Sequence, residues 1–302
     1  KAELIKLKAQ NVEGIILDLR NNGGGSLTEV VDIMGLFMKN GPVVQVKDGN
    51  GKIQVLKNKQ NDPIWTGPLV IMQNELSASA SEILAGAMQD YGRAVIVGSP
   101  QSFGKGTVQT FVELNRFLNT SDDFGALKLT IQKFYRVNGK STQLKGVDSD
   151  IPMKDIFTYE EIGERYDNYA LPWDQVSTSG FAPLNTLNMS NLVNNSAKRL
   201  TQNKNYQLLL ESAQWKEKLD KEEKVTLNLK EFESLMKARK EQIEKFKSLI
   251  KFNNGLNFTL HADEAKRGKT DEVFAKKSEN WLKNLKRDIY LQETVNIISE
   301  MK

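Results

Sequence analysis

The chain contains three short, uninterrupted aliphatic runs, and these constrain its fold more than any other feature. They are GIILDL at 14–19, PLVIMQ at 68–73 and AVIVG at 94–98. Runs of this length and composition predict buried strands. Helical patterns lie between them, at 27–38 and 80–91. Strands interleaved with helices predict an α/β core with a parallel or mixed sheet.

Four further segments read as strands with a more exposed face. VVQV at 43–46 and IQVL at 53–56 flank the turn-rich KDGNG, which predicts a hairpin. TVQTFVEL at 107–114 and GALKLTIQKFYRV at 125–137 alternate apolar and polar residues. The predicted core therefore extends to about residue 155.

The later part of the chain has a different character. Residues 156–200 form an aromatic, Pro- and Ser-containing connector, and we expect Tyr159, Tyr166, Tyr169 and Trp173 to pack it onto the core. Residues 201–302 are charged and helical in pattern, including one long helical stretch at 274–301, and pairs such as Glu241 and Lys245 support exposed helices. We thus predict domains at 1–155 and 201–302 joined by 156–200.

Composition narrows the chemistry. A chain of 302 residues, 39% hydrophobic and 26% charged, is ordinary for a globular protein of two domains. The net charge of +4 gives no argument for nucleic acid, and no apolar run is long enough to span a membrane. The absence of cysteine excludes thiol catalysis and thiolate metal sites. The start of the chain, KAELIKLKAQ, lacks the apolar region of a signal peptide, and the sequence reads as a piece of a longer protein.

The single histidine, His261, lies in the lysine-rich part of the chain, where a histidine is usually solvated. A Ser-His-Asp triad would have to use it. Any base in this protein is therefore expected to be a lysine or a carboxylate.

The stretch SASASEILAGAMQDYG at 77–92 places serines at the start of a predicted helix. Ser79 with Glu82 fits a capping box, which is the structural explanation. The alternative is a nucleophile. A serine at a strand-to-helix turn exposes its hydroxyl beside free N–H groups, and the N–H of Ala80 could then donate to an oxyanion.

Two glycine-rich segments bear on the choice between these explanations, and the first of them favours a nucleophile. DLRNNGGGS at 18–26 follows a buried strand, and its three consecutive glycines suggest a close approach by a ligand, with Gly25 as a second oxyanion donor. GSPQSFGKGTVQ at 98–109 resembles a phosphate-binding loop, but the glycine spacing is one residue too long and Gly106 stands where Ser or Thr is required.

Lys105 has another use in the absence of a catalytic histidine. Between Phe103 and Val108 the apolar surroundings would disfavour the ammonium form, and a neutral amine can deprotonate a serine. Gln109, four residues later, could hold that amine. A glycine-rich turn, a serine at a helix start and a lysine in a glycine loop together form a coherent acyl-transfer site.

These motifs resemble those of the C-terminal processing peptidases, specifically the tail-specific protease branch. The resemblance rests on DLRNNGGG, SASASEILAGAMQDYGRAVIVG, FGKGTVQ and KFYRVNGKSTQLKGVDSDIPM and covers about residues 12–155. It implies the roles already suggested: nucleophile Ser79, general base Lys105, positioning residue Gln109, and oxyanion donors Gly25 and Ala80. The family's further aspartate falls on Asp90, which is about 16 Å along the helix from Ser79 and suits a structural role.

The resemblance implies a mixed-sheet serine protease core, here partial, followed by a helical C-terminal domain. It implies protein substrates with apolar, poorly structured C-termini, an adaptor protein as a candidate partner, an exported or periplasmic location, and no metal, cofactor or nucleic acid. Such proteases usually carry an N-terminal helical region and a PDZ domain. Nothing before 14–19 accounts for these, so we expect this chain alone to be weakly active or inactive.

Two alternatives remain from the residues themselves. The first is a non-catalytic scaffold in which Ser79 is only a helix cap and the helical half binds a partner. The second is a nucleotide-binding α/β protein, which the loop spacing disfavours.

Overall fold

The computed structural model describes residues 1–117, 122–184 and 187–301. The chain divides into two compact units. The first comprises residues 1–153 and 161–189 together with Met301, and the second comprises residues 154–160 and 190–300. The connector predicted at 156–200 thus contributes to both units, and its residues 185–186 lie outside the described part of the chain.

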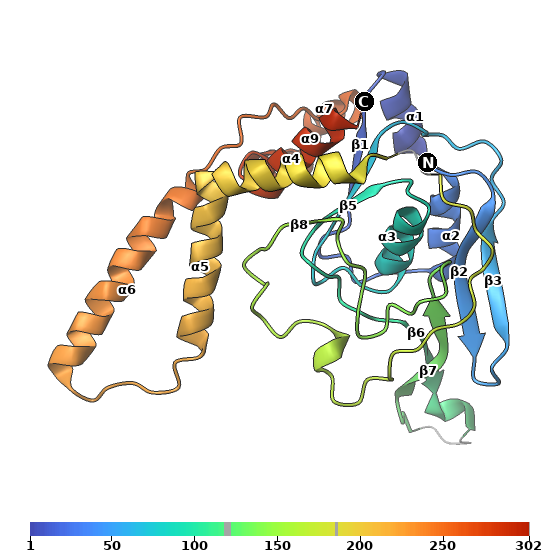
Figure 1. Cartoon of the computed structure of the whole chain (residues 1–302), viewed down its shortest axis with the longest axis horizontal. Helices are drawn as coiled ribbons and strands as arrows, with labels where there is room; N and C mark the ends of the chain where they lie inside the picture. Colours follow the sequence, from blue (N-terminus) through green and yellow to red (C-terminus); the bar gives the residue numbers. More distant parts are fainter. Residues whose placement is uncertain (118–121, 185–186, 302) are drawn as a thin grey trace. The chain divides into compact units, whose positions relative to one another are not determined.

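The first unit is built on a four-stranded parallel sheet (Figure 1). Its strands, in spatial order, are β1 (Ile15–Asp18), β4 (Leu69–Gln73), β5 (Val95–Gly98) and β8 (Ile151–Pro152). The three aliphatic runs become the neighbouring strands β1, β4 and β5, with Ile15 opposite Leu69 and Ile71 opposite Ile96. Every residue of β4 and β5 is buried, as the uninterrupted apolar composition predicts.

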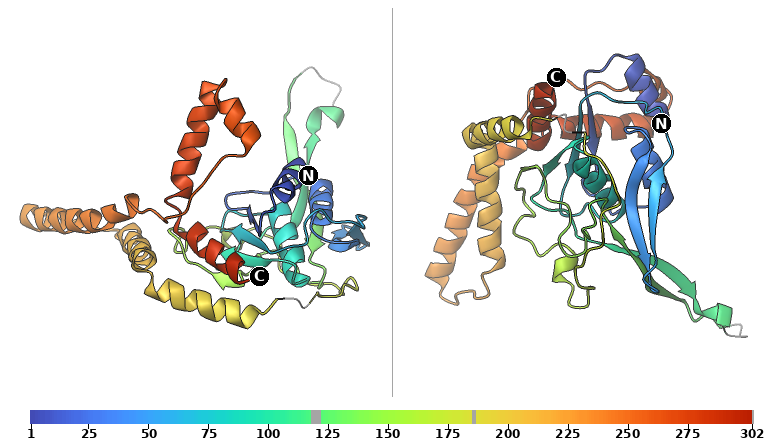
Figure 2. Two further views of the ribbon diagram at one scale, coloured as in Figure 1. Left: turned by 90° about the horizontal axis from the view of Figure 1, so that it is seen from above. Right: turned by 45° about the vertical axis from the view of Figure 1, so that its right-hand side comes forward.

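The second sheet of this unit is antiparallel. Its strands, in spatial order, are β3 (Ile53–Asn58), β2 (Gly41–Asp48), β7 (Ala126–Tyr135) and β6 (Thr107–Glu113). The predicted hairpin is β2–β3, and the two alternating segments form the β6–β7 hairpin, which extends away from the other strands (Figure 2). The predicted mixed α/β class is confirmed, but its parallel and antiparallel parts form separate sheets.

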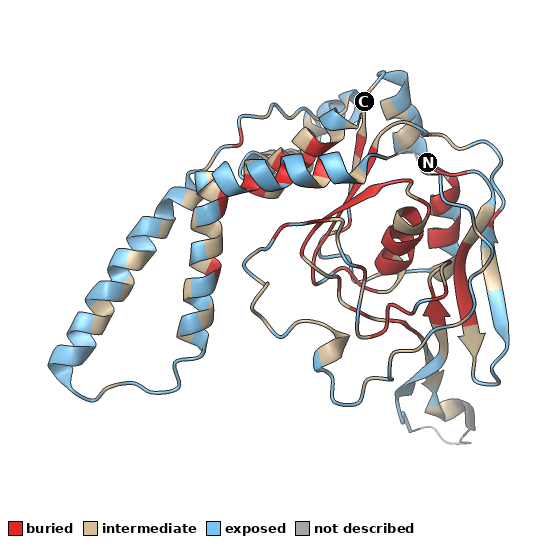
Figure 3. Ribbon diagram, in the orientation of Figure 1, coloured by how far each residue is buried: buried red, intermediate tan, exposed pale blue. Residues whose placement is uncertain are grey.

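Helices fill the space between the sheets. α2 (Leu27–Gly35) packs against β2 and β3, and α3 (Ala80–Asp90) contacts both β5 and β2. The face of α3 that the periodicity predicts is buried, and most of this helix is buried in Figure 3, whereas α2 buries one face only. Gly92, with φ of 63°, follows the helix end as the expected stop. A short helix, α1 (Ala2–Ala9), precedes β1.

Residues 161–184 run along the first unit and contain the short helical turn η2 (Glu164–Tyr166). Trp173 packs as predicted: its indole N–H donates to the carbonyl of Ser141 at 2.9 Å, and Lys145 Nζ lies 3.6 Å from its ring centre. The prediction for Tyr169 is wrong, because its side chain is 95% exposed. It stands on a turn closed by the N–H of Ala170 and the carbonyl of Asp167, which directs the ring outward.

The second unit is helical, as predicted. Its helices are α4 (Met189–Gln202), α5 (Lys204–Asp220), α6 (Leu229–Ile250), α7 (Ala262–Gly268), α8 (Glu272–Leu285) and α9 (Ile289–Glu300). α4 and α9 are joined by the ion pair of Arg199 with Glu293, at 2.8 Å. Lys245 of α6 pairs with Glu211 of α5 rather than with Glu241, and Trp215 and Phe246 pack between the same two helices.

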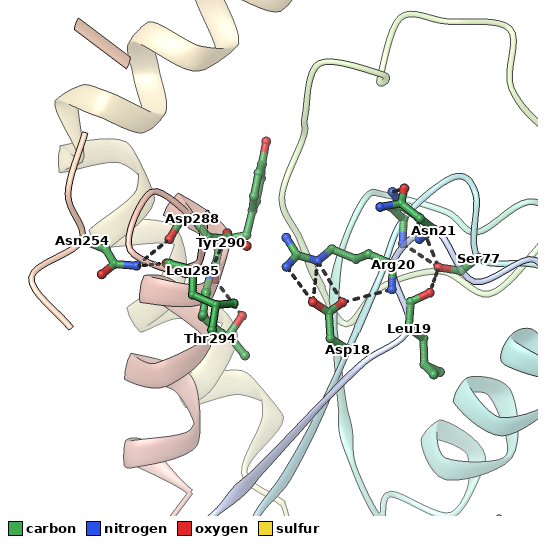
Figure 4. Close-up of polar contacts among 12 residues, drawn as sticks. Asp18, Leu19, Arg20, Asn21, Ser77, Asn254, Leu285, Asp288, Tyr290 and Thr294 are labelled. Carbon is green, nitrogen blue, oxygen red and sulfur yellow. Dashed lines mark hydrogen bonds and ion pairs between the residues drawn. The ribbon is translucent and has the colours of Figure 1, made fainter. Parts of the chain in front are cut away.

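The helix expected at 274–301 is broken between α8 and α9. Asn254, from the loop after α6, donates its amide N–H groups to the carbonyls of Leu285 at 2.6 Å and Asp288 at 3.1 Å (Figure 4). Asp288 in turn accepts the N–H of Leu291 and caps α9. The break depends on the Asn254 side chain, more than 30 residues away, so the local helical pattern does not predict it. None of the described helices is both long and apolar enough to cross a membrane.

Candidate active site

Three loops meet at the carboxyl edge of the parallel sheet, where α/β folds commonly bind ligands. Residues 19–26 follow β1, residues 74–79 follow β4, and residues 99–106 follow β5. Ser77 ties them together, since its hydroxyl donates to the carbonyl of Leu19 at 2.8 Å and its own carbonyl accepts the N–H of Phe103 at 3.0 Å.

The loop after β1 is also held from within. Arg20 pairs with Asp18 at 2.7 Å, and the N–H of Asn21 donates to the side chain of Asn74 at 2.8 Å. Figure 4 shows this chain of contacts from Asp18 to Ser77. The glycine run that follows is therefore anchored at its start against the loop that carries Ser79.

Ser79 occupies the sharp turn between β4 and α3. Its φ of 57° and ψ of −113° are uncommon for a residue with a side chain, and such backbone strain is concentrated at functional sites. Ser79 and Glu82 hold the capping-box positions, and the N–H of Ser79 donates to Glu82 Oε2 at 2.8 Å. Ser79 thus fills the position of a helix cap, as the structural explanation predicts. N-cap residues normally have an extended backbone, however, so capping alone does not account for the conformation of this serine.

The glycine run lies directly against Ser79. A Cβ on Gly24, whose φ is +107°, would stand 2.8 Å from the Ser79 Cβ and from the Ala78 carbonyl oxygen. Only glycine permits this approach. Neither the N–H of Gly25 nor that of Ala80 donates to any residue described in the structure, and both residues border the same pocket as Ser79. Two N–H groups are thus available to an incoming ligand.

Lys105 reaches the same pocket from the loop after β5. Its Nζ donates to Gln109 Oε1 at 2.8 Å, and Gln109 is on β6 just after an irregularity in the pairing with β7. The pocket has a volume of about 410 Å³. It is bordered by every residue predicted for the chemistry, namely Gly25, Ser79, Ala80, Lys105 and Gln109. Its wall also contains the apolar side chains of Leu27, Ile83, Val108 and Phe134 and the polar side chains of Thr107 and Lys128.

Glu82 is a part of this site to which the sequence analysis gave only a capping role. Its side chain is fully buried, and burial raises its pKa to about 7 despite four hydrogen bonds that act in the opposite direction. Oε1 accepts from the Ser102 hydroxyl at 2.6 Å and the Gly104 N–H at 2.7 Å. Oε2 accepts from the N–H groups of Ser79 and Lys105, at 2.8 Å and 3.0 Å. One carboxyl group thus joins the turn that carries Ser79 to the loop that carries Lys105.

Glu82 also bears on the nucleotide-binding alternative. A phosphate-binding loop needs its backbone N–H groups free to bind the ligand. Here the N–H groups of Gly104 and Lys105 are already bound to a carboxyl group of the chain itself. The Glu82 carboxyl oxygens therefore occupy the positions that phosphate oxygens would take in a nucleotide-binding loop.

Two other predicted residues lie apart from the pocket. Asp90 ends α3, away from Ser79, and accepts hydrogen bonds from Arg136 Nε at 3.0 Å and from Asn138 at 2.8 Å. These contacts tie α3 to the end of β7, in keeping with a structural role. His261 belongs to the second unit, where its Nδ1 accepts the N–H of Asp263 at 3.3 Å and caps α7. Within the described part of the chain no cluster of residues has the composition of a metal site.

Residues 1–153 match peptidase family S41. The chain belongs to this family. Residues 157–302 match the C-terminal domain of tail-specific protease, so both parts of the sequence-based resemblance are confirmed. The chain is 47% identical over 196 residues to the tail-specific protease of Haemophilus influenzae, covering 64% of this S41 chain and 28% of that protein.

A carboxy-terminal-processing protease of Bartonella bacilliformis is 36% identical over 166 residues, covering 54% of this chain and 35% of its own length. Among solved structures, the photosystem II D1 C-terminal processing protease is 32% identical with a TM-score of 0.44, covering 50% of this chain and 37% of that one. This S41 chain thus spans about a third of the length of the relatives it matches.

Proposed function

We propose that this S41 chain carries the reaction centre of a serine endopeptidase that works through a Ser-Lys dyad. The observation that supports it most is the single pocket shared by Ser79, the Lys105–Gln109 pair and two N–H groups without an internal acceptor among the described residues. A hydroxyl, a base and oxyanion donors within one pocket are the parts that acyl transfer requires.

In the proposed reaction Ser79 Oγ attacks the carbonyl carbon of the scissile peptide bond, and the neutral amine of Lys105 takes the hydroxyl proton. The N–H groups of Gly25 and Ala80 stabilise the oxyanion. When the C–N bond breaks, Lys105 gives its proton to the leaving amine. Water then attacks the ester with Lys105 again as base, which releases the acid and restores Ser79. Gln109 holds the Lys105 amine on the pocket side through its side-chain carbonyl.

The substrates we propose are proteins with apolar, poorly structured C-termini. Such a chain would enter as an added strand, because backbone pairing tolerates many sequences. β6 is the edge strand of the antiparallel sheet and carries Gln109 beside the pocket, so it offers that pairing next to the dyad. A periplasmic location and an adaptor protein follow from the resemblance and belong to the same proposal.

The test uses the complete gene product that contains this sequence and an unfolded protein ending in an apolar tail. Lys105→Ala is expected to reduce cleavage by a factor of about 10² or more, with Lys52→Ala as the matched control because Lys52 is exposed in the β2–β3 turn. Circular dichroism would establish that both variants are folded. Equal cleavage by wild type and Lys105→Ala would refute the dyad, and no cleavage by folded wild type would favour the scaffold alternative.

A further inference from the structure

A second pocket lies at the other end of α3, within the first unit. Its volume is about 500 Å³, within the range of small-molecule sites. The side chains that matter most in its wall are Pro42, Pro63, Tyr91, Phe181, Leu184 and Arg93. Tyr91 and Phe181 pack edge to face at 5.3 Å, and the Tyr91 hydroxyl donates to the carbonyl of Pro42 at 2.9 Å. The wall is therefore largely apolar and held in place.

Arg93 is the buried charged residue of this wall, whose other polar residues are Lys39, Asn40 and Thr66. It is only 8% exposed, and its Nε and Nη2 donate to the backbone carbonyls of Phe37 at 2.9 Å and Trp65 at 3.0 Å. No carboxylate pairs with it among the residues that the structure describes. Burial lowers the pKa of its guanidinium to about 10, and no acidic group offsets that effect. The group is still charged at neutral pH.

A buried cation without a counter-ion is costly, and arginines in protein interiors are normally matched by an acid. The two carbonyls use only part of the guanidinium's five N–H donors. The remaining donors suit a planar carboxylate, which arginine binds in a paired geometry. The apolar wall beside Arg93 suits a hydrocarbon or aromatic tail.

We propose that this pocket binds a small carboxylic acid with an apolar tail, its carboxylate paired with Arg93 and its tail packed against the Tyr91–Phe181 pair. The site is distinct from the candidate active site: Ser79 precedes α3 and Tyr91 follows it, which places them about 18 Å apart along the helix. The inference does not depend on the proposed peptidase activity.

The test is calorimetric titration of the 302-residue chain with 3-phenylpropionate, with 3-phenylpropionamide as the uncharged match. We expect the acid to bind and the amide to bind at least tenfold more weakly. Arg93→Gln is expected to raise the dissociation constant of the acid at least tenfold. Ala182→Trp keeps the test decisive if Arg93→Gln fails to fold, because Ala182 is exposed at the pocket and a bulky ring there blocks it.

Ser79→Ala serves as the control that should bind the acid unchanged. A dipeptide ending in phenylalanine, compared with its C-terminal amide, tests whether the carboxylate could come from a peptide terminus instead of a free small acid. We expect the free small acid to bind more tightly than the dipeptide. Tighter binding of the dipeptide would overturn the small-acid assignment. Equal binding of acid and amide, no binding of the acid to wild type, or full binding to folded Ala182→Trp would each overturn the site.

Discussion

At the residue scale, Glu82 is the group on which the candidate active site is centred. Its two oxygens accept from Ser79, Ser102, Gly104 and Lys105, and thereby set the distance between the Ser79 turn and the Lys105 loop. A glutamine at this position would replace one acceptor oxygen with an NH₂ group, so that two of the four donors would face another donor.

We therefore expect Glu82→Gln in the complete gene product to lower kcat for tail-dependent cleavage by about 10- to 100-fold, because small displacements of catalytic groups have effects of this size. KM should change little, since Glu82 is buried and does not face substrate. Asp32→Asn, an exposed carboxyl on α2, is the matched control. An unchanged kcat in folded Glu82→Gln would show that the two loops keep their positions without it.

The raised pKa of Glu82 also predicts a dependence of folding on pH. The carboxyl titrates near 4.5 when unfolded and at about 7 when folded, so the folded state holds the proton more tightly between those values. The free energy of unfolding should then fall as pH rises from about 4.5 to about 7, by at most about 3.5 kcal/mol at ~1.4 kcal/mol per pH unit. Urea titrations across this range would measure it. If Glu82→Gln shows the same slope as wild type, another group is responsible.

The sequence predicts those candidate site residues that stand in a recognisable motif. Ser79, Lys105 and Gln109 stand in a recognisable order, and the structure places them around one pocket. Glu82 was visible only as a helix-cap residue, because its partners Ser102 and Gly104 lie in a loop about 20 residues away. Arg93 carried no signal, since its lack of an acidic partner among the described residues is a property of the folded environment.

At the element scale, the glycine loop and the start of α3 depend on one close contact. Gly24 combines a φ of +107° with a position where a Cβ would meet the Ala78 carbonyl oxygen at 2.8 Å, whereas a Cβ on Gly23 would have no atom within 4 Å. Gly24→Ala should therefore destabilise the first unit by about 2 kcal/mol or more, and Gly23→Ala by less than about 1 kcal/mol. Thermal unfolding of both variants would compare them, and equal losses would show that the contact is not limiting.

Most individual elements follow from local pattern, but their pairing does not. Continuous aliphatic runs identified β1, β4 and β5, and the KDGNG turn identified the β2–β3 hairpin. β8 has only two residues and is defined by its partner β5 rather than by its own sequence. The separation of parallel and antiparallel strands into two sheets likewise depends on contacts between distant segments.

At the scale of the whole molecule, polar groups that stabilise each unit are recruited across long stretches of chain. Asn254 interrupts a helical pattern more than 30 residues ahead, and Arg199 joins α4 to α9 through Glu293. In the first unit, residues 161–184 return to a core formed mainly by residues before 153. Local sequence patterns do not predict such contacts between distant segments of the chain.

The meeting of three loops at the edge of the parallel sheet has a consequence for when the proposed chemistry can occur. Gly25, Ser79 and Lys105 come from loops after three different strands, and they share a pocket only when β1, β4 and β5 are paired. A newly made or partly unfolded copy keeps the hydroxyl, the amine and the oxyanion donors apart. Under the proposed function, an unfolded copy of this chain would therefore have no assembled reaction centre and could not cleave other unfolded chains.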